Sequence, residues 1–428
     1  MAESIFNAFK MAQQQFDEIA EQMNLEQSTR ELLRNPLREY YLSIPVKIRR
    51  GMTRILRGMR IQYNDACGPS IGGVRFHPQA SANTTRALAA WTTWTCALME
   101  LPLGGAAGAV ICDPYNLSLL EQEQICRGWV RQLACNLGPL RDAPAPDLMT
   151  NAQHTLWMLD EYETLYGAKY PGFSMGKPIE AGRLKKSEPA AGYGVIAMIR
   201  ESLKEMKITP DATTASVQGF GTIARSAIEC YEQLGGKVTA VACWDQKELK
   251  SYTLHKTGGI DGEALRKIAD PFGSIHKKRA MEAGYGVLPG DAWLEQDVDI
   301  LIPAALENQI SVDNVGRISE QVKLIAEGAY GATTPEADRE LNQRHILLIP
   351  DLLCSGRGMI SHYLEQVQSN MNSSWGEHEM LTDPDSKMIS AFLAVSELAG
   401  KKKLSLRQAA YVIAIDRVAR ACKARGWI

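Results

Sequence analysis

The chain has 428 residues, 45% hydrophobic and 22% charged, a composition that excludes a disordered or fibrous protein and predicts a globular one with two domains. A formal net charge of -2 excludes a strong field for nucleic acid or an anionic membrane, and favours small, weakly charged ligands. The 9 cysteines form no Cys-x-x-Cys pair. We therefore expect no disulfide framework, no metal site and a reducing, cytoplasmic location.

The N-terminal residues contain an early acid and no apolar stretch of signal length, so we expect no secretory leader. No segment offers the roughly 18 apolar residues that a membrane-spanning helix needs. Between residues 46 and 112, extended segments alternate with a helical pattern at 82–99, which predicts a sheet covered by helices. Residues 170–192 are rich in Pro, Gly, Lys and Ser, the composition of a connecting loop.

Beyond this loop, short apolar runs bounded by turns or helical patterns predict a buried parallel sheet. These runs are 214–218, 237–242, 299–303, 323–326 and 346–350. The stretch 355–427 has helical periodicity. The predicted fold class is α/β with two domains, one with a mixed sheet and one a doubly wound Rossmann domain. We place the first domain at 1–185, completed by 355–428, and the second at 186–354.

A glycine motif follows the first of these runs and opens a helix. It reads Gly219-Phe-Gly221-Thr-Ile-Ala224, in which the first glycine makes the tight turn and the second lets a pyrophosphate approach the backbone. The context favours a dinucleotide site over a merely structural turn. At the end of the next run, Asp245 either accepts ribose hydroxyls or is an ordinary loop carboxylate, and Trp244 either covers the adenine or caps the domain surface. No arginine cluster invites a 2′-phosphate, so NAD is slightly favoured and NADP stays open.

Several motifs along the chain resemble the glutamate/leucine/phenylalanine/valine dehydrogenase family, and most closely its glutamate dehydrogenase branch. Among them are Gly72-Gly-Val-Arg-Phe-His-Pro78, Ala143-Pro-Ala-Pro-Asp147, Met175-Gly-Lys-Pro178 and Glu327-Gly-Ala-Tyr330. The resemblance extends from about residue 40 to the end. It implies a subunit with its active cleft between the two domains, assembly as a hexamer, and NAD- or NADP-dependent oxidative deamination of an amino acid.

The family's three working lysines are absent from this chain. The resemblance places the lysine for the side-chain carboxylate at Ile71, the lysine for the α-carboxylate at Thr95, and the catalytic lysine at Ala107. The proton-shuttling aspartate is retained as Asp147. Because a desolvated carboxylate needs a paired cation, we expect that glutamate is not the substrate.

Other family positions are changed as well. His362 replaces a serine and is either a new acid or base or a packing residue, while Arg357 is either a new anion contact or the partner of a surface acid. We expect Asp147 and His362 as catalytic candidates. The expected substrate-pocket residues are Ile71, Gly72, Gly73, Thr95, Ala107, Met175, Ser355, Arg357 and Met359. The expected cofactor-binding residues are Ala191, Gly219, Phe220, Gly221, Thr222, Ile223, Trp244, Asp245, Ala304 and Asn308.

Two functions of different class follow from this resemblance. The first is an NAD(P)-dependent oxidoreductase that acts on a less charged substrate, since the glycine motif and Asp147 have been kept. The second is a catalytically silent subunit that assembles with an active paralogue and binds an effector, since all three lysines have been lost. The expected partners are a small-molecule substrate or effector and other subunits in a homo-hexamer or mixed hexamer, without nucleic acid or membrane.

Overall fold

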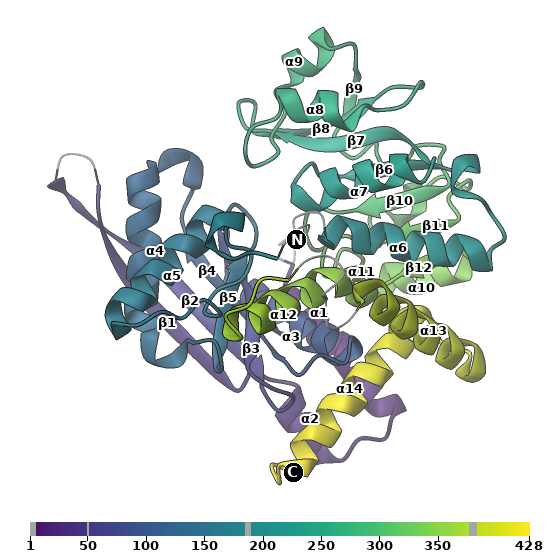
Figure 1. Ribbon diagram of the computed structural model, residues 1–428. Coiled ribbons are helices and arrows are strands. Elements are labelled where there is room, and N and C mark those ends of the chain that lie inside the picture. The colour runs from purple at the N-terminus through teal and green to yellow at the C-terminus, as the bar shows by residue number, and fades with distance from the viewer. Residues whose placement is uncertain (1–5, 49–50, 185–189, 376–382) are drawn as a thin grey trace, which may run out of the picture. The chain divides into compact units, whose positions relative to one another are not determined.

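The chain forms two compact units, each with its own sheet (Figure 1). The computed structural model describes residues 6–48, 51–184, 190–375 and 383–428. The first unit consists of Met1–Glu188, Met359–Asp383 and Tyr411–Ile428, and the second of Pro189–Gly358 and Pro384–Ala410. We expected the whole of 355–428 in the first domain, whereas residues 355–358 and 384–410 group with the second unit.

The sheet of the first unit has five strands in the order β1-β2-β4-β3-β5. β2 runs antiparallel to β1 and β4, whereas β3 runs parallel to β4 and β5. The sheet is therefore mixed, which confirms the prediction for this domain. The strands are β1 (Arg38–Lys47), β2 (Thr53–Asn64), β3 (Ser70–Phe76), β4 (Gly104–Ile111) and β5 (Asp142–Pro146).

Helices cover both faces of this sheet (Figure 1). On one face, Gly105 of β4 lies so close to α3 that a Cβ would overlap the backbone nitrogen of Thr93. On the other face, Trp129 of α4 would lie 3.1 Å from a Cβ at Gly108, inside a buried cluster with Val74. The helices are α1 (Ala8–Gln22), α2 (Gln27–Leu33), α3 (Ala82–Leu98), α4 (Leu119–Leu133) and α5 (Ala152–Tyr166).

Two C-terminal helices, α12 (Gly356–Asn370) and α14 (Leu406–Ala424), complete the first unit. The guanidinium of Arg417 donates hydrogen bonds to the carbonyls of Ala97 and Leu98. These carbonyls belong to the last turn of α3. Carbonyl groups in the last turn of a helix lack the backbone N–H donor that lies four residues further along within the helix. The long-range contact thus caps the helix that covers the sheet.

The second unit contains a sheet of seven strands in the order β12-β11-β10-β6-β7-β8-β9. The five strands from β12 to β7 are parallel, and each coincides with one of the five apolar runs, except that β7 continues past its run to Asp245, so this prediction is confirmed. β8 and β9 extend the sheet in antiparallel orientation and were not predicted, because neither contains an uninterrupted apolar run. The strands are β6 (Thr214–Gln218), β7 (Lys237–Asp245), β8 (Lys250–His255), β9 (Gly286–Pro289), β10 (Ile300–Pro303), β11 (Leu324–Ala326) and β12 (Leu347–Ile349).

Helices of the second unit pack tightly on one another near the glycine motif. A Cβ on Gly192 of α6 would lie 2.5 Å from the backbone nitrogen of Ala227 in α7. The start of α14 joins this unit because Arg407 forms buried ion pairs with Glu327 and Asp351. The helices are α6 (Ala190–Glu205), α7 (Thr222–Gln233), α8 (Gly262–Ile268), α9 (Lys277–Glu282), α10 (Pro335–Gln343), α11 (Asp351–Cys354) and α13 (Pro384–Lys402).

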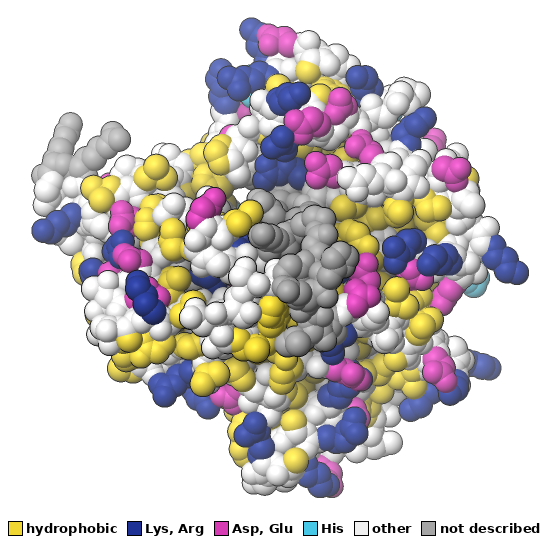
Figure 2. All heavy atoms as spheres, in the orientation of Figure 1, with side chains coloured by type: hydrophobic (Ala, Val, Ile, Leu, Met, Phe, Trp, Pro, Cys, Tyr) yellow, Lys and Arg dark blue, Asp and Glu magenta, His cyan; other side chains and the backbone are white. Residues whose placement is uncertain are grey.

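Charged side chains of both signs are interspersed over the face shown in Figure 2, in agreement with the net charge of -2. Within the described residues, no helix is both long enough and apolar enough to cross a membrane.

Candidate substrate and nucleotide sites

Two of the three positions expected to carry lysine lie on one face of the first sheet. Ile71 of β3 pairs with Gly105 of β4, and because side chains alternate along a strand, Ala107 shares their face. It is the face that α3 covers at Gly105. Ile71 is 0% exposed and Ala107 is also buried. Both positions at which the resemblance predicts lysine are therefore neutral and enclosed by protein.

The third position and the neighbouring Met175 are buried as well. Thr95 lies in α3 and is fully buried, as is Met175. The backbone nitrogen of Met175 donates to the carbonyl of Pro144 at 2.9 Å, which ties this residue to β5, the strand beside β3. A cation at Ile71, Thr95 or Ala107 would lose its hydration. It would gain no counter-charge from the other two positions, because their residues are neutral.

Asp147 follows the carboxyl end of β5 and is positioned by three contacts. Its Oδ2 accepts a hydrogen bond from Nε of Arg75 at 2.9 Å, and its backbone nitrogen donates to Oγ1 of Thr150 at 2.8 Å. A Cβ on Gly73 would lie 2.5 Å from Cβ of Asp147, so glycine is needed there. The Asp147 side chain is 31% exposed, so its carboxylate is held in place and still accessible. Arg75 was not among the expected site residues, although it lies within the motif Gly72-Gly-Val-Arg-Phe-His-Pro78.

A buried cation supports the double glycine from the opposite face of the sheet. Arg60 pairs with Asp142, with 2.9 Å between Nε and Oδ2, and donates through Nη1 to the carbonyls of Gly72 and Gly73. The guanidinium lies 5.9 Å from the ring of Trp129, which belongs to the α4 face. Arg60 thus fixes the backbone of β3 and does not replace a lysine on the α3 face.

Lys177 is the buried lysine closest in sequence to Met175, and its ammonium is fully occupied. Its Nζ donates to the carbonyl of Ser174 at 2.7 Å and to Oγ of Ser369 at 3.5 Å, and it lies 3.0 Å from Oε1 of Glu365. Burial lowers the pKa of Lys177, and the charge of Glu365 opposes that shift. Three acceptors use its three N–H donors, so Lys177 does not provide a substrate cation.

His362 lies on α12 among charged groups and is half-buried. Burial lowers the pKa of His362, opposed by the charge of Glu365 and aided by Arg183 and Lys177. The imidazole is therefore neutral at pH 7. Within the described residues, no hydrogen bond joins His362 to Asp147, so the two catalytic candidates are not brought into direct contact.

Three expected pocket residues lie around the first turn of α12. Arg357 forms an ion pair with Asp385 of α13 and stacks over the ring of Tyr193 at 4.9 Å. Its charge is therefore balanced locally, which favours the surface-acid interpretation. Ser355 follows α11 and its backbone nitrogen donates to the carbonyl of Asp351, whereas Met359 is buried.

The glycine motif has the geometry of a phosphate-binding turn. Gly219 has a φ of +101° and donates its N–H to the carbonyl of Ala242 on β7 at 2.7 Å. Gly221 precedes α7, and a Cβ there would meet nothing within 4 Å. The free amides at the start of a helix and the space before them suit a pyrophosphate.

Other expected cofactor residues surround this turn. A Cβ on Gly219 would lie 2.8 Å from the carbonyl oxygen of Ala304, and Ile223 and Ala304 both line the space beside Gly328. Phe220 is buried against Gly273, and Thr222 is exposed at the first turn of α7. The remaining positions lie farther along the same unit: Ala191 beside Gly358, Asn308 bonded through its nitrogen to Gly331, and Trp244 and Asp245 at the end of β7.

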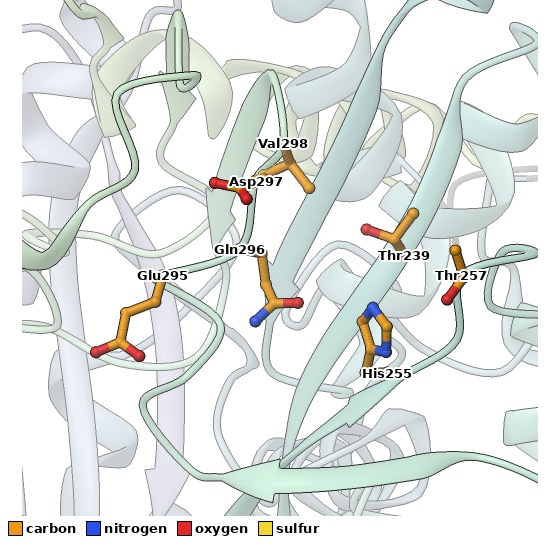
Figure 3. A pocket seen from close by; sticks show the side chains of 7 residues that line it. All are labelled: Thr239, His255, Thr257, Glu295, Gln296, Asp297 and Val298. Carbon is orange, nitrogen blue, oxygen red and sulfur yellow. The ribbon is translucent and has the colours of Figure 1, made fainter.

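A shallow recess of about 350 Å³ lies elsewhere in the second unit (Figure 3). It includes Thr239 near the start of β7, His255 at the end of the antiparallel β8, and Val298 shortly before β10. These positions mark the amino ends of the parallel strands. A dinucleotide binds at the carboxyl ends, so the recess is not the expected nucleotide site.

Comparison with known proteins identifies the family of the chain. A family model described as Glutamate/Leucine/Phenylalanine/Valine dehydrogenase matches residues 182–426, and the model of the Glu/Leu/Phe/Val dehydrogenase dimerisation domain matches residues 36–164. The chain is 36% identical over 426 residues to an NAD-specific glutamate dehydrogenase of Clostridioides difficile, with 98% of each chain covered.

Solved structures give the same assignment. Glutamate dehydrogenase from Peptoniphilus asaccharolyticus is 36% identical with a TM-score of 0.80, and the similarity covers 99% of this chain and 100% of that one. A chain of the hetero-hexameric glutamate dehydrogenase from Thermus thermophilus, in its Leu-bound form, is 28% identical with a TM-score of 0.89, covering 98% and 97%. This chain therefore belongs to the glutamate/leucine/phenylalanine/valine dehydrogenase family.

Proposed function

We propose that this protein is a glutamate dehydrogenase-like oxidoreductase that uses NAD and acts on an amino acid or related compound without a side-chain carboxylate. The observation that carries the proposal is the buried, neutral character of Ile71 and Ala107 on the sheet face beneath α3. The glycine turn at 219–221 and the NAD-specific relatives support the choice of cofactor.

The substrate class follows from the cost of desolvating an anion. A carboxylate removed from water without a paired cation costs several kcal/mol, and the buried cations among the described residues of the first unit are already paired. Arg60 is paired with Asp142, and Lys177 with Glu365. The buried side chains of Ile71 and Met175 are suited to an apolar substrate side chain instead.

Asp147 is the group that we propose to move the proton. Its carboxylate is accessible, and Arg75 and Thr150 hold its position. Bound NAD would supply the hydride acceptor, and the turn at 219–221 would hold its pyrophosphate. His362 is neutral and half-buried, and stays a second candidate for proton transfer.

A turnover assay tests the substrate class. We expect purified protein to bind NADH and to reduce NAD with an apolar amino acid, with glutamate slower by at least about 100-fold, the factor equivalent to roughly 2.7 kcal/mol of lost ion pairing. Brisk turnover of glutamate by the wild-type protein would contradict the proposal.

The Ala107→Lys variant tests the same proposal by introducing one of the three lysines that the family resemblance predicts. We expect no robust glutamate turnover in it, because Ile71 and Thr95 still leave both carboxylates without a cation. Ala109→Lys, a second buried alanine of β4 on the same face, controls for the effect of an added lysine on folding. Glutamate activity in Ala107→Lys alone would show that some other group binds the carboxylates.

The second candidate function is a silent or regulatory subunit. It is favoured by the loss of a base at Ala107 and by the similarity to a chain of the Thermus thermophilus hetero-hexamer. Co-expression with a glutamate dehydrogenase from the same genome and native mass spectrometry would decide between the two. Mixed hexamers without turnover by this chain alone favour the regulatory subunit, whereas assembly alone with NAD-linked turnover favours the enzyme.

A further inference from the structure

The end of β7 is the part of the second unit where the adenosine half of a dinucleotide is normally recognised. Gln218 of β6 pairs with Ala242 of β7, and Gly219 bonds to the carbonyl of Ala242. Residues Cys243–Asp245 therefore continue β7 beyond the glycine turn. In a doubly wound domain, the residue at the end of the second strand contacts the adenine ribose, and this residue is usually an acid.

Asp245 is the acid in this place, but its carboxylate is already bonded. Oδ1 accepts the backbone N–H groups of Lys247 at 2.9 Å and Glu248 at 3.2 Å, and Oδ2 accepts that of Lys277 at 2.7 Å. Asp245 is 1% exposed. Burial alone would raise the pKa of Asp245, but the three backbone donors outweigh it and lower the pKa. The carboxylate closes the turn after β7 and holds the start of α9.

Trp244 lies on the opposite side of the strand from Asp245 and is 46% exposed. Its indole N–H donates to Oε1 of Gln246 at 2.8 Å, which fixes the orientation of the ring. Its carbonyl accepts the N–H of Ile275 at 2.9 Å, and the N–H of Gln246 donates to Oγ of Ser274 at 2.8 Å. An exposed aromatic ring that is held at both its backbone and its indole nitrogen is prepared to stack on a flat ligand.

We propose that the face of Trp244 binds the adenine ring of the dinucleotide, and that Asp245 is a positioning residue which does not touch the nucleotide. The inference rests on the proposed dinucleotide site and adds which residue holds its adenosine end. The alternative is that Trp244 only caps the domain surface.

Binding of NADH and of AMP to Trp244→Ala tests the inference. AMP is the adenosine half alone, so its binding reports this end of the site. We expect both affinities to fall about tenfold, since stacking of a base on an aromatic ring contributes roughly 1–3 kcal/mol. Trp427→Ala removes another exposed tryptophan, in the first unit, and leaves both affinities unchanged.

Energy transfer locates the ring directly. Excitation of indole sensitises the emission of bound NADH, and we expect Trp244→Phe to lose a large part of this signal while it keeps most of the affinity, because a flat ring face remains. Trp427→Phe keeps the signal. Loss of affinity equal to that of Trp244→Ala would contradict a stacking role.

A double variant separates positioning from contact. If Asp245 acts only through Trp244, Asp245→Asn weakens AMP binding in the wild-type background and causes no further loss in Trp244→Ala. Additive losses would overturn the assignment of Asp245. Unchanged NADH and AMP affinities in Trp244→Ala would overturn the role of Trp244 while leaving the dinucleotide site intact. Failure of the wild-type protein to bind NADH would overturn both the site and this inference.

Discussion

Gly219 and Gly221 are two residues apart in one turn, but glycine is needed at them for different reasons. Gly219 has a φ of +101°, and a Cβ would lie 2.8 Å from the carbonyl oxygen of Ala304, so both backbone and packing require it. Gly221 has a φ of -71° and open space around its Cα. Among the described residues, none comes close enough to require glycine at residue 221, and this agrees with the proposed approach of a pyrophosphate to the turn.

This difference predicts different outcomes for two alanine substitutions. We expect Gly221→Ala to weaken NADH binding about tenfold without changing the midpoint of thermal unfolding, because the methyl group occupies only ligand space. Gly219→Ala should lower both the NADH affinity and the midpoint of thermal unfolding, since its methyl group strains the protein itself. Fluorescence titration and thermal unfolding measure the two effects. As a control, Gly258→Ala adds a methyl group in another open position and should change neither the NADH affinity nor the midpoint of unfolding. Unchanged NADH affinity in Gly221→Ala would refute the proposal that Gly221 leaves space for the dinucleotide.

Lys177 and Glu365 join two elements of the first unit, the loop that carries Met175 and helix α12. Both side chains are 0% exposed, and Glu365 also accepts the backbone N–H groups of Gly176 and Lys177. A buried ion pair contributes little net stability, but removal of one partner leaves an uncompensated charge. The pair therefore fixes α12, and with it His362, against the loop.

Lys177→Met should destabilise the protein by about 3–5 kcal/mol, because Glu365 loses its counter-charge inside the protein. Lys401→Met breaks the exposed pair between Lys401 and Glu397 on α13 and should have little effect on stability, because solvent screens both charges. Denaturant unfolding compares the two. We expect the double variant Lys177→Met/Glu365→Gln to recover part of the loss, and equal stabilities of the two single lysine variants would contradict the role of burial.

At the scale of the whole molecule, the C-terminal segment returns to the second unit and places Arg407 among three carboxylates. Its nitrogens lie 2.8 Å from Glu327, 2.8 Å from Asp338 and 3.2 Å from Asp351. One cation does not balance three buried anions. Burial and the neighbouring Asp351 raise the pKa of Glu327 to about 7, although Arg407 opposes the shift.

The cluster of Arg407 with Glu327, Asp338 and Asp351 should make the stability of the protein depend on pH. Between about pH 4.5 and 7, folded Glu327 keeps a proton that the unfolded chain releases, so stability falls as the pH rises through this window. Glu327→Gln does not ionise, and we expect its stability to increase relative to the wild-type protein from pH 5 to pH 8. Thermal unfolding at a series of pH values measures the trend. The exposed Glu320→Gln serves as control, and parallel profiles for Glu327→Gln and the wild type would count against the shifted pKa.

The parallel strands and the glycine turn could be predicted because their signals are local. A buried parallel strand is an uninterrupted apolar run, and the turn is specified by glycines at a fixed spacing. β8 and β9 were missed because neither contains an uninterrupted apolar run: β8 reads Lys-Ser-Tyr-Thr-Leu-His, and β9 is a four-residue edge strand. The association of residues 384–410 with the second unit has no local signal in the sequence, because contacts such as that of Arg407 with Glu327 join residues 80 positions apart.

The sequence alone determined the family resemblance and the neutral residues Ile71, Thr95 and Ala107 at the positions where that resemblance predicts lysine, because identity at a motif position needs no coordinates. Only the tertiary structure decided whether other cations replace them. Arg60 lies on the opposite sheet face, and Lys177 is neutralised by Glu365, 188 residues away. The charge available to a ligand is set by long-range pairing and burial, and neither is encoded in the residues next to a motif.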